Sequence, residues 1–221
     1  MKEAQTVRSG RACRDQTATR KKGGMKWFNE IEATIHERAD PLPGDEMISD
    51  AAGSLTNAIT LRCSREEVWP WLVQMGAGRA GWYSYDTLDN GGRRSAEQII
   101  PELQNAPVGS IFPALPQRRD GFVLVESEPA HWLILGWPAP TRRLVVTWAF
   151  VLKKVKPNVT RLIVRARASE EYRFHGLPTA MGVLLARVVH FVMERKQLLE
   201  IARRVEGGQK EGARHGSAAT E

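Results

Sequence analysis

The apolar character of the last long helical segment places the strongest constraint on the fold. Residues 178–205 have a helical pattern, and the first half, through Met193, is apolar on nearly every side apart from Arg187 and His190. A helix that is apolar all round must be buried on most sides. The second half is rich in charged residues and is expected to emerge into solvent. The rest of the chain must therefore supply a surface that encloses this helix.

Several segments before this helix have the two-residue period of β-strands. The clearest are 144–153 and 160–168, which a Pro-Asn turn separates, and together they predict an antiparallel hairpin. In 160–168 three arginines point outward, whereas Leu162, Val164, Ala166 and Ala168 point inward. A shift of one residue would bury the arginines, so this register is well defined. Further strands are expected at 54–63, 110–114, 121–128 and 132–137.

The segments before the main run of strands contain helix and turn signals. Residues 26–38 are expected to form a short helix or an extended arm, and a proline- and glycine-rich turn follows. Ser64 and Glu67 have the spacing of a capping box, which predicts a helix that ends near Gly76. A second short helix is expected at 95–103. This order predicts an α+β fold in which a curved antiparallel sheet wraps around the C-terminal helix and leaves a cleft beside it.

The charge of the chain divides it into a basic tail and a nearly neutral domain. The 221 residues have a net charge of +7, and residues 1–24 contain seven basic residues against two acidic ones. We therefore expect a disordered basic tail at 1–24, one domain at 25–206 and a flexible C-terminal tail at 207–221. Because the domain itself is nearly neutral, no nucleic-acid-binding face is expected on it. Met25, which opens the domain, is a candidate for the true initiator.

The two cysteines, Cys13 and Cys63, form neither a disulfide framework nor a metal-binding spacing with the histidines. They are compatible with a reducing cytoplasm. The sequence contains no apolar leader and no run of about 18 apolar residues, so neither secretion nor a membrane span is expected. These patterns predict a cytoplasmic protein without a metal or a cofactor, and they leave the oligomeric state open.

Residues 78–90 combine aromatic rings, carboxylates and glycines in one loop. Such a loop suits a pocket wall, because rings supply contact area and a few polar groups fix the orientation of a ligand. The alternative is a capped turn with partly buried rings. Two further tryptophans on the strands could line the same pocket. The candidate ligand-binding residues are Trp82, Tyr83, Tyr85, Asp86, Asp89, Asn90, Trp132 and Trp148.

Three carboxylates are candidates for acid–base chemistry. Asp86 and Asp89 are three residues apart, so on a helical turn they would share a face and could act as a paired acid and base. They could equally cap the turn before Asn90. Glu194 is expected either at the mouth of the cleft or as a solvated carboxylate on the helix surface, with His190 as its only possible partner along the helix. His190 itself is expected to be a satisfied core histidine.

Several long runs of the sequence resemble a known superfamily. They are ATIHERADPLPGDEMI at 33–48, VWPWLVQMGAGRAGWYSYDTLDN at 68–90, IIPELQ at 99–104, TWAFVL at 147–152 and FVMERKQL at 191–198. In these runs the chain resembles an uncharacterised bacterial subgroup of the START and Bet v 1-like (SRPBCC, polyketide cyclase-like) superfamily. The resemblance implies a helix-grip fold, but not a particular reaction, because the superfamily includes lipid carriers, receptors, cyclases and hydrolytic or oxygenase domains.

These observations leave three hypotheses about function. The first is a protein that binds a small hydrophobic or amphipathic molecule, such as a lipid, between the sheet and the C-terminal helix. The second is a cyclase or dehydratase that uses a carboxylate or a tyrosine in the same cavity. The third is a partner-binding module that acts through the basic tail. The absence of a strong catalytic pattern favours the first.

Overall fold

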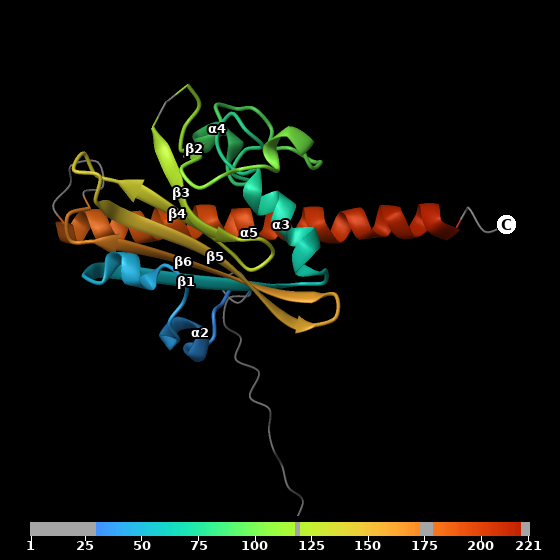
Figure 1. The fold of residues 1–221 in the computed structure, drawn as a ribbon, viewed down its shortest axis with the longest axis horizontal. Helices are drawn as coiled ribbons and strands as arrows, with labels where there is room; N and C mark the ends of the chain where they lie inside the picture. The colour runs from blue at the N-terminus through green and yellow to red at the C-terminus, as the bar shows by residue number, and fades with distance from the viewer. Residues whose placement is uncertain (1–29, 118–119, 173–178, 218–221) are drawn as a thin grey trace, which may run out of the picture.

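The computed structural model describes residues 30–117, 120–172 and 179–217. These residues form one six-stranded antiparallel sheet in the order β1-β6-β5-β4-β3-β2, with the long helix α5 (Thr179–Ser217) along it (Figure 1). The strands are β1 (Ala51–Leu61), β2 (Ile111–Pro113), β3 (Gly121–Glu128), β4 (Trp132–Pro138), β5 (Leu144–Lys156) and β6 (Val159–Ser169). The α+β helix-grip fold predicted from the sequence is thereby confirmed.

Short helical segments lie in the connections between these elements. They are α2 (Ile35–Ala39), η1 (Asp45–Ile48), α3 (Arg65–Val73), α4 (Asp86–Asp89) and η2 (Pro101–Leu103). The start of α3 is as predicted, because the Ser64 hydroxyl accepts from the Glu67 amide and the Glu67 carboxylate accepts from the Ser64 amide. This reciprocal pair satisfies two of the amides that a helix start leaves free.

The main core lies between one face of the sheet and α5. It contains Leu162 and Val164 of β6, Phe150 of β5, and Leu198 and Ile201 of α5. The predicted hairpin register is confirmed, since Phe150 pairs with Val164 and the inward residues of both strands share this face. The sheet therefore meets the helix with a continuous apolar surface, which is the main source of stabilisation.

The opposite face of the sheet is covered rather than open to solvent. Arg165 was expected to point outward, and it does lie on this face, but only 3% of the residue is exposed. The segment 31–48, which includes α2 and η1, lies over it. The Arg165 guanidinium pairs with the Asp45 carboxylate at 2.5 Å and donates to the carbonyls of Glu37, Arg38 and Asp40. A buried guanidinium needs all of these acceptors, because an unpaired buried charge is costly.

The same N-terminal segment also reaches the outer edge of the sheet. Glu32 forms an isolated antiparallel bridge with Asn57 of β1, and the Ala58 amide donates to the Ile31 carbonyl at 3.0 Å. Arg161 of β6 adds a half-buried ion pair with Glu37 at 2.8 Å. Together these contacts fix the segment across β1 and β6.

Two local predictions are wrong. Residues 95–103 form no helix beyond the short η2, because the Ser95 side chain bonds Asp86 and the Tyr83 amide instead of capping a helix. The C-terminal helix was expected to end at Gly207 and Gly208, but α5 continues to Ser217. The predictions for the basic tail and for Met25 lie outside the described residues.

We predict that the buried Arg165 ion pair is essential for the attachment of the N-terminal segment. The substitution Arg165→Ala removes the buried guanidinium that donates to Asp45 and to three carbonyls, so it should lower the free energy of unfolding by about 3 kcal/mol or more. The matched control is Arg143→Ala, whose exposed pairs with Asp50 and Glu171 should contribute less than about 1 kcal/mol. Urea unfolding of both variants checks this, and equal losses would contradict it.

Candidate functional site

A cavity of about 700 Å³ lies between the sheet, the loop that follows α3, and α5. Its walls are mainly apolar. Aromatic rings contribute to them, among which Trp82 of the loop, Phe122 of β3, Trp137 of β4 and Trp148 of β5 pack against one another. Volumes of this size are usual for sites that bind small molecules.

Small residues at one end of the sheet leave this space empty. Ala168 of β6 pairs with Gly53 of β1 on one side and with Val146 of β5 on the other. Ala166 likewise lies opposite Trp148. All five residues line the cavity. Larger side chains at Gly53, Ala166 or Ala168 would fill the gap between sheet and helix.

The rings form one connected cluster. Trp82 stacks on Trp148 with a centroid distance of 5.4 Å and an angle of 27° between the ring planes. Phe122 meets Trp137 edge to face at 5.2 Å and also contacts Trp148 at 5.4 Å. Such packing restrains each ring and presents a rigid apolar wall.

The backbone of the loop turns Trp82 and Ser84 into the cavity and Tyr83 away from it. Tyr83 has a φ of 57°, which is unfavourable for a bulky residue. Its side chain is nevertheless fully buried, with its hydroxyl accepting from Gln74 at 2.8 Å and the Arg204 guanidinium 4.8 Å from its ring centroid. These contacts offset the backbone strain. Burial also raises the pKa of the Tyr83 hydroxyl, so it is neutral at physiological pH.

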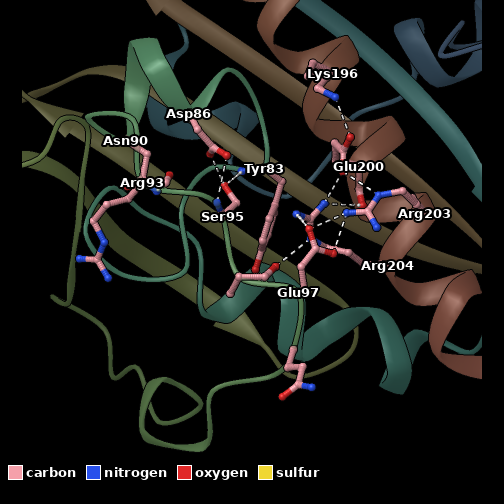
Figure 2. Close-up of polar contacts among 12 residues, drawn as sticks. Tyr83, Asp86, Asn90, Arg93, Ser95, Glu97, Lys196, Glu200, Arg203 and Arg204 are labelled. Carbon is pink, nitrogen blue, oxygen red and sulfur yellow. Dashed lines mark hydrogen bonds and ion pairs between the residues drawn. The ribbon is translucent and has the colours of Figure 1, made fainter.

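Polar contacts hold the loop to its own turn and to α5 (Figure 2). Both oxygens of Asp86 accept from Ser95, at 2.6 Å from the hydroxyl and 3.0 Å from the amide. Glu97 accepts from Arg203 and Arg204 of α5, and Glu200 pairs with the same two arginines. The close approach of Ser95 also explains Gly81, where a Cβ would lie 2.2 Å from the Ser95 hydroxyl.

Asp89, at the end of α4, is a buried carboxylate that lines the cavity and is 5% exposed. The Ser84 hydroxyl lies beside it, but the single proton of that hydroxyl is donated to the Met193 carbonyl at 3.1 Å. Among the described residues, neither oxygen of Asp89 therefore has a hydrogen-bond partner. Burial, together with the nearby Asp86 charge, raises the pKa of Asp89 to about 6.

Glu194 of α5 is also buried, with 1% of the residue exposed, so the expectation of a solvated carboxylate is wrong. It accepts from the Asn57 amide at 2.5 Å and from the Trp148 indole at 3.3 Å. The His190 Nε2 lies 3.6 Å from it, which agrees with the pairing that the helical spacing allows. His190 was expected to be a satisfied core histidine, but it is half-buried and its Nε2 has no hydrogen-bond partner in the described part of the chain.

The structure brings together only some of the candidate residues. Trp82, Trp148, Asp89 and Glu194 line the cavity. The cavity lining does not include Tyr83, Tyr85, Asp86, Asn90 or Trp132. Their ligand-binding and catalytic roles stay predictions, and the geometry gives most of these residues other contacts.

Trp132 and Asn90 are two residues with such contacts. Trp132 donates to Glu126, and its ring packs against the residues under the N-terminal segment. Asn90 accepts from the Gly78 amide and donates to the Arg93 carbonyl.

Sequence reasoning missed Gln197 and Ser84 as cavity residues. Gln197 donates to the Trp82 carbonyl at 3.0 Å, and its Oε1 is buried without a partner among the described residues. The available signal was the helical period, since 190, 193, 194 and 197 follow the i, i+3, i+4, i+7 spacing of one helix face. No comparable pattern in the sequence identifies Ser84.

No group of three His, Cys, Asp or Glu side chains in ranges 30–117, 120–172 and 179–217 could hold a metal ion. Within the same ranges, no helix is both long enough and apolar enough to cross a membrane.

We predict that ionised Asp89 destabilises the fold. An aspartate in the unfolded chain ionises near pH 4, about two units below the pKa of about 6 in the folded protein. Between these values the folded state holds a proton that the unfolded state has lost, so stability falls as the pH rises from about 4 to about 6. Asp89→Asn should therefore raise the free energy of unfolding at pH 7.5 by about 1–3 kcal/mol and much less at pH 4.

Urea unfolding at the two pH values measures this difference. The exposed Asp50→Asn serves as the matched control and should change stability little at either pH. An equal effect of Asp89→Asn at both pH values would contradict the prediction.

No protein-family model and no curated protein sequence matches this chain. Solved structures do match. The Polyketide_cyc-like protein Cgl2372 from Corynebacterium glutamicum is 15% identical, with a TM-score of 0.46 over 72% of this chain and 94% of that one. The protein MLL2253 from Mesorhizobium loti is 13% identical, with a TM-score of 0.42 over 70% and 97% of the two chains. The Aha1 dimer from Colwellia psychrerythraea is 17% identical, with a TM-score of 0.35 over 69% and 99%. The likeness concerns the fold alone, and the sheet order together with α5 is that of a helix-grip fold.

Proposed function

We propose that the protein binds a small hydrophobic or amphipathic molecule in the cavity between the sheet and α5. The observation that supports this is the wall of four packed rings around a volume of about 700 Å³. Protein interiors are normally packed without voids of this size, because each void forfeits contacts and costs stability. A ligand with an apolar body would recover those contacts.

The few polar groups of the cavity would orient such a ligand. Asp89, Glu194 and Gln197 face the cavity from two different elements, the loop and α5. Most of the remaining lining is apolar, so a bound molecule would bury its apolar part against the rings and present its polar end to these groups.

A second candidate function is an enzyme of cyclase or dehydratase type. The observation that favours it is Asp89, a buried carboxylate whose pKa of about 6 lies near neutrality, where a general acid or base works best. Asp86, the other member of the candidate pair, is held by Ser95 outside the cavity lining. If Asp89 catalyses loss of water, the compound extracted from the native protein should be one water lighter than that from Asp89→Asn.

We predict that filling the empty end of the cavity abolishes binding. Ala168→Phe projects a ring between Gly53 and Val146 into the cavity, so the affinity for the neutral dye Nile red should fall at least about tenfold. The matched control is Ala39→Phe on the exposed surface of α2, which should leave the affinity unchanged. Fluorescence titration measures both. Unaltered binding by a folded Ala168→Phe variant would refute the cavity as the site.

A further inference from the structure

The hydrogen-bonding groups of the cavity are unbalanced, because acceptors without donors predominate. Five buried lining atoms have no hydrogen-bond partner among the described residues: three acceptors, which are both oxygens of Asp89 and the Oε1 of Gln197, and two ring or guanidinium nitrogens, the Nε2 of His190 and the Nε of Arg167. Buried polar atoms in folded proteins are nearly always hydrogen-bonded, so each exception needs an explanation. Three such acceptors around one cavity indicate a bound group that donates hydrogen bonds.

The two arginines in the described cavity lining, Arg167 and Arg187, form no ion pair with the carboxylates of Asp89 or Glu194. The Arg167 guanidinium is turned to the other face of the sheet, where it donates to the Ile48 carbonyl at 2.9 Å and lies 3.8 Å from Asp45. Arg187 is exposed. The His190 Nε2 lies 3.6 Å from a Glu194 oxygen.

The Glu194 carboxylate already accepts hydrogen bonds from other side chains, whereas the Asp89 carboxylate accepts none from the described residues. Asn57 and Trp148 both donate to Glu194. At pH 7.5 Asp89 is mainly ionised, because its pKa is about 6, and a buried unpaired carboxylate lowers stability. A carboxylate in this state gains most from a ligand that brings a positive charge.

The aromatic wall is suited to the same kind of ligand. Trp82 and Trp148 are stacked, and both line the cavity. The faces of tryptophan rings attract cations, and this attraction strengthens where water is excluded. Rings that accept an apolar chain therefore also tolerate an ammonium group nearby.

We propose that the ligand of this cavity is an amphipathic amine, whose cationic end binds Asp89 and whose apolar part lies against the tryptophan rings. The inference deepens the proposed function and rests on it, because it names the chemical class that the same cavity accepts. A fatty acid is disfavoured, since a carboxylate placed beside Asp89 and Glu194 would be repelled by both.

The test compares three probes with the same ten-carbon chain, which are decylamine, decan-1-ol and decanoic acid. Binding to the full-length protein is measured at pH 7.5 by tryptophan fluorescence, with concentrations below the onset of micelle formation. The amine should bind at least about tenfold more tightly than the acid, because a charge-assisted hydrogen bond to a buried carboxylate is strong. In Asp89→Asn the affinity for the amine should fall about tenfold relative to the affinity for the alcohol. The control Asp50→Asn should preserve the ranking.

The outcomes separate this inference from the proposed function. Binding of the acid as tightly as the amine, or an unchanged amine affinity in Asp89→Asn, overturns the inference. If the alcohol binds and the amine has no advantage, the apolar cavity stands and the amine preference fails. If none of the three probes binds the native protein, both proposals fail. The ranking in the native protein decides the matter even if Asp89→Asn does not fold.

Discussion

The packing of α5 against the sheet is the interaction on which the rest of the structure depends. The helix covers the apolar residues of β5 and β6, and it also provides the anchor for the loop through Arg203 and Arg204. One helix thus contributes to the core, fixes the loop and lines the cavity. These roles fall on successive parts of the helix. Residues within 190–197 line the cavity, Leu198 and Ile201 enter the core, and Arg203 and Arg204 hold the loop.

The cavity lowers the stability that this packing provides. Small residues such as Gly53 and Ala168 leave space where larger ones would pack, and Asp89 is buried without a partner. Each of these features opposes folding, and each becomes favourable only when another molecule is present. Locally unfavourable features concentrated at one place are typical of functional sites. On the opposite face of the sheet, by contrast, the buried charge of Arg165 is paired, because Asp45 and three carbonyls accept hydrogen bonds from it.

The sequence predicted the architecture well because that architecture follows from periodicity. The alternation in β6 defined its register, and the apolar half of the C-terminal segment required a sheet around it. The site was predicted only in part. Tyr83 and Trp82 are adjacent aromatic residues, and a positive φ, invisible in the sequence, decides which of them faces the cavity. Burial of Glu194 likewise depends on Asn57, which is 137 residues away. The helical end at Gly207 was misjudged because two glycines lower helix propensity without preventing a helix.

The contact between the N-terminal segment and β1 also affects how the molecule behaves among copies of itself. β1 is an outermost strand, and an outermost strand exposes amides and carbonyls that can pair with another chain. The bridge between Glu32 and Asn57 and the hydrogen bond from the Ala58 amide to the Ile31 carbonyl lie near the middle of the outer edge of β1. A chain that lost this segment would expose both a bare strand and the buried arginine of the adjacent one. The segment therefore blocks strand pairing between copies of the chain at β1, in addition to burying the outer face of the sheet.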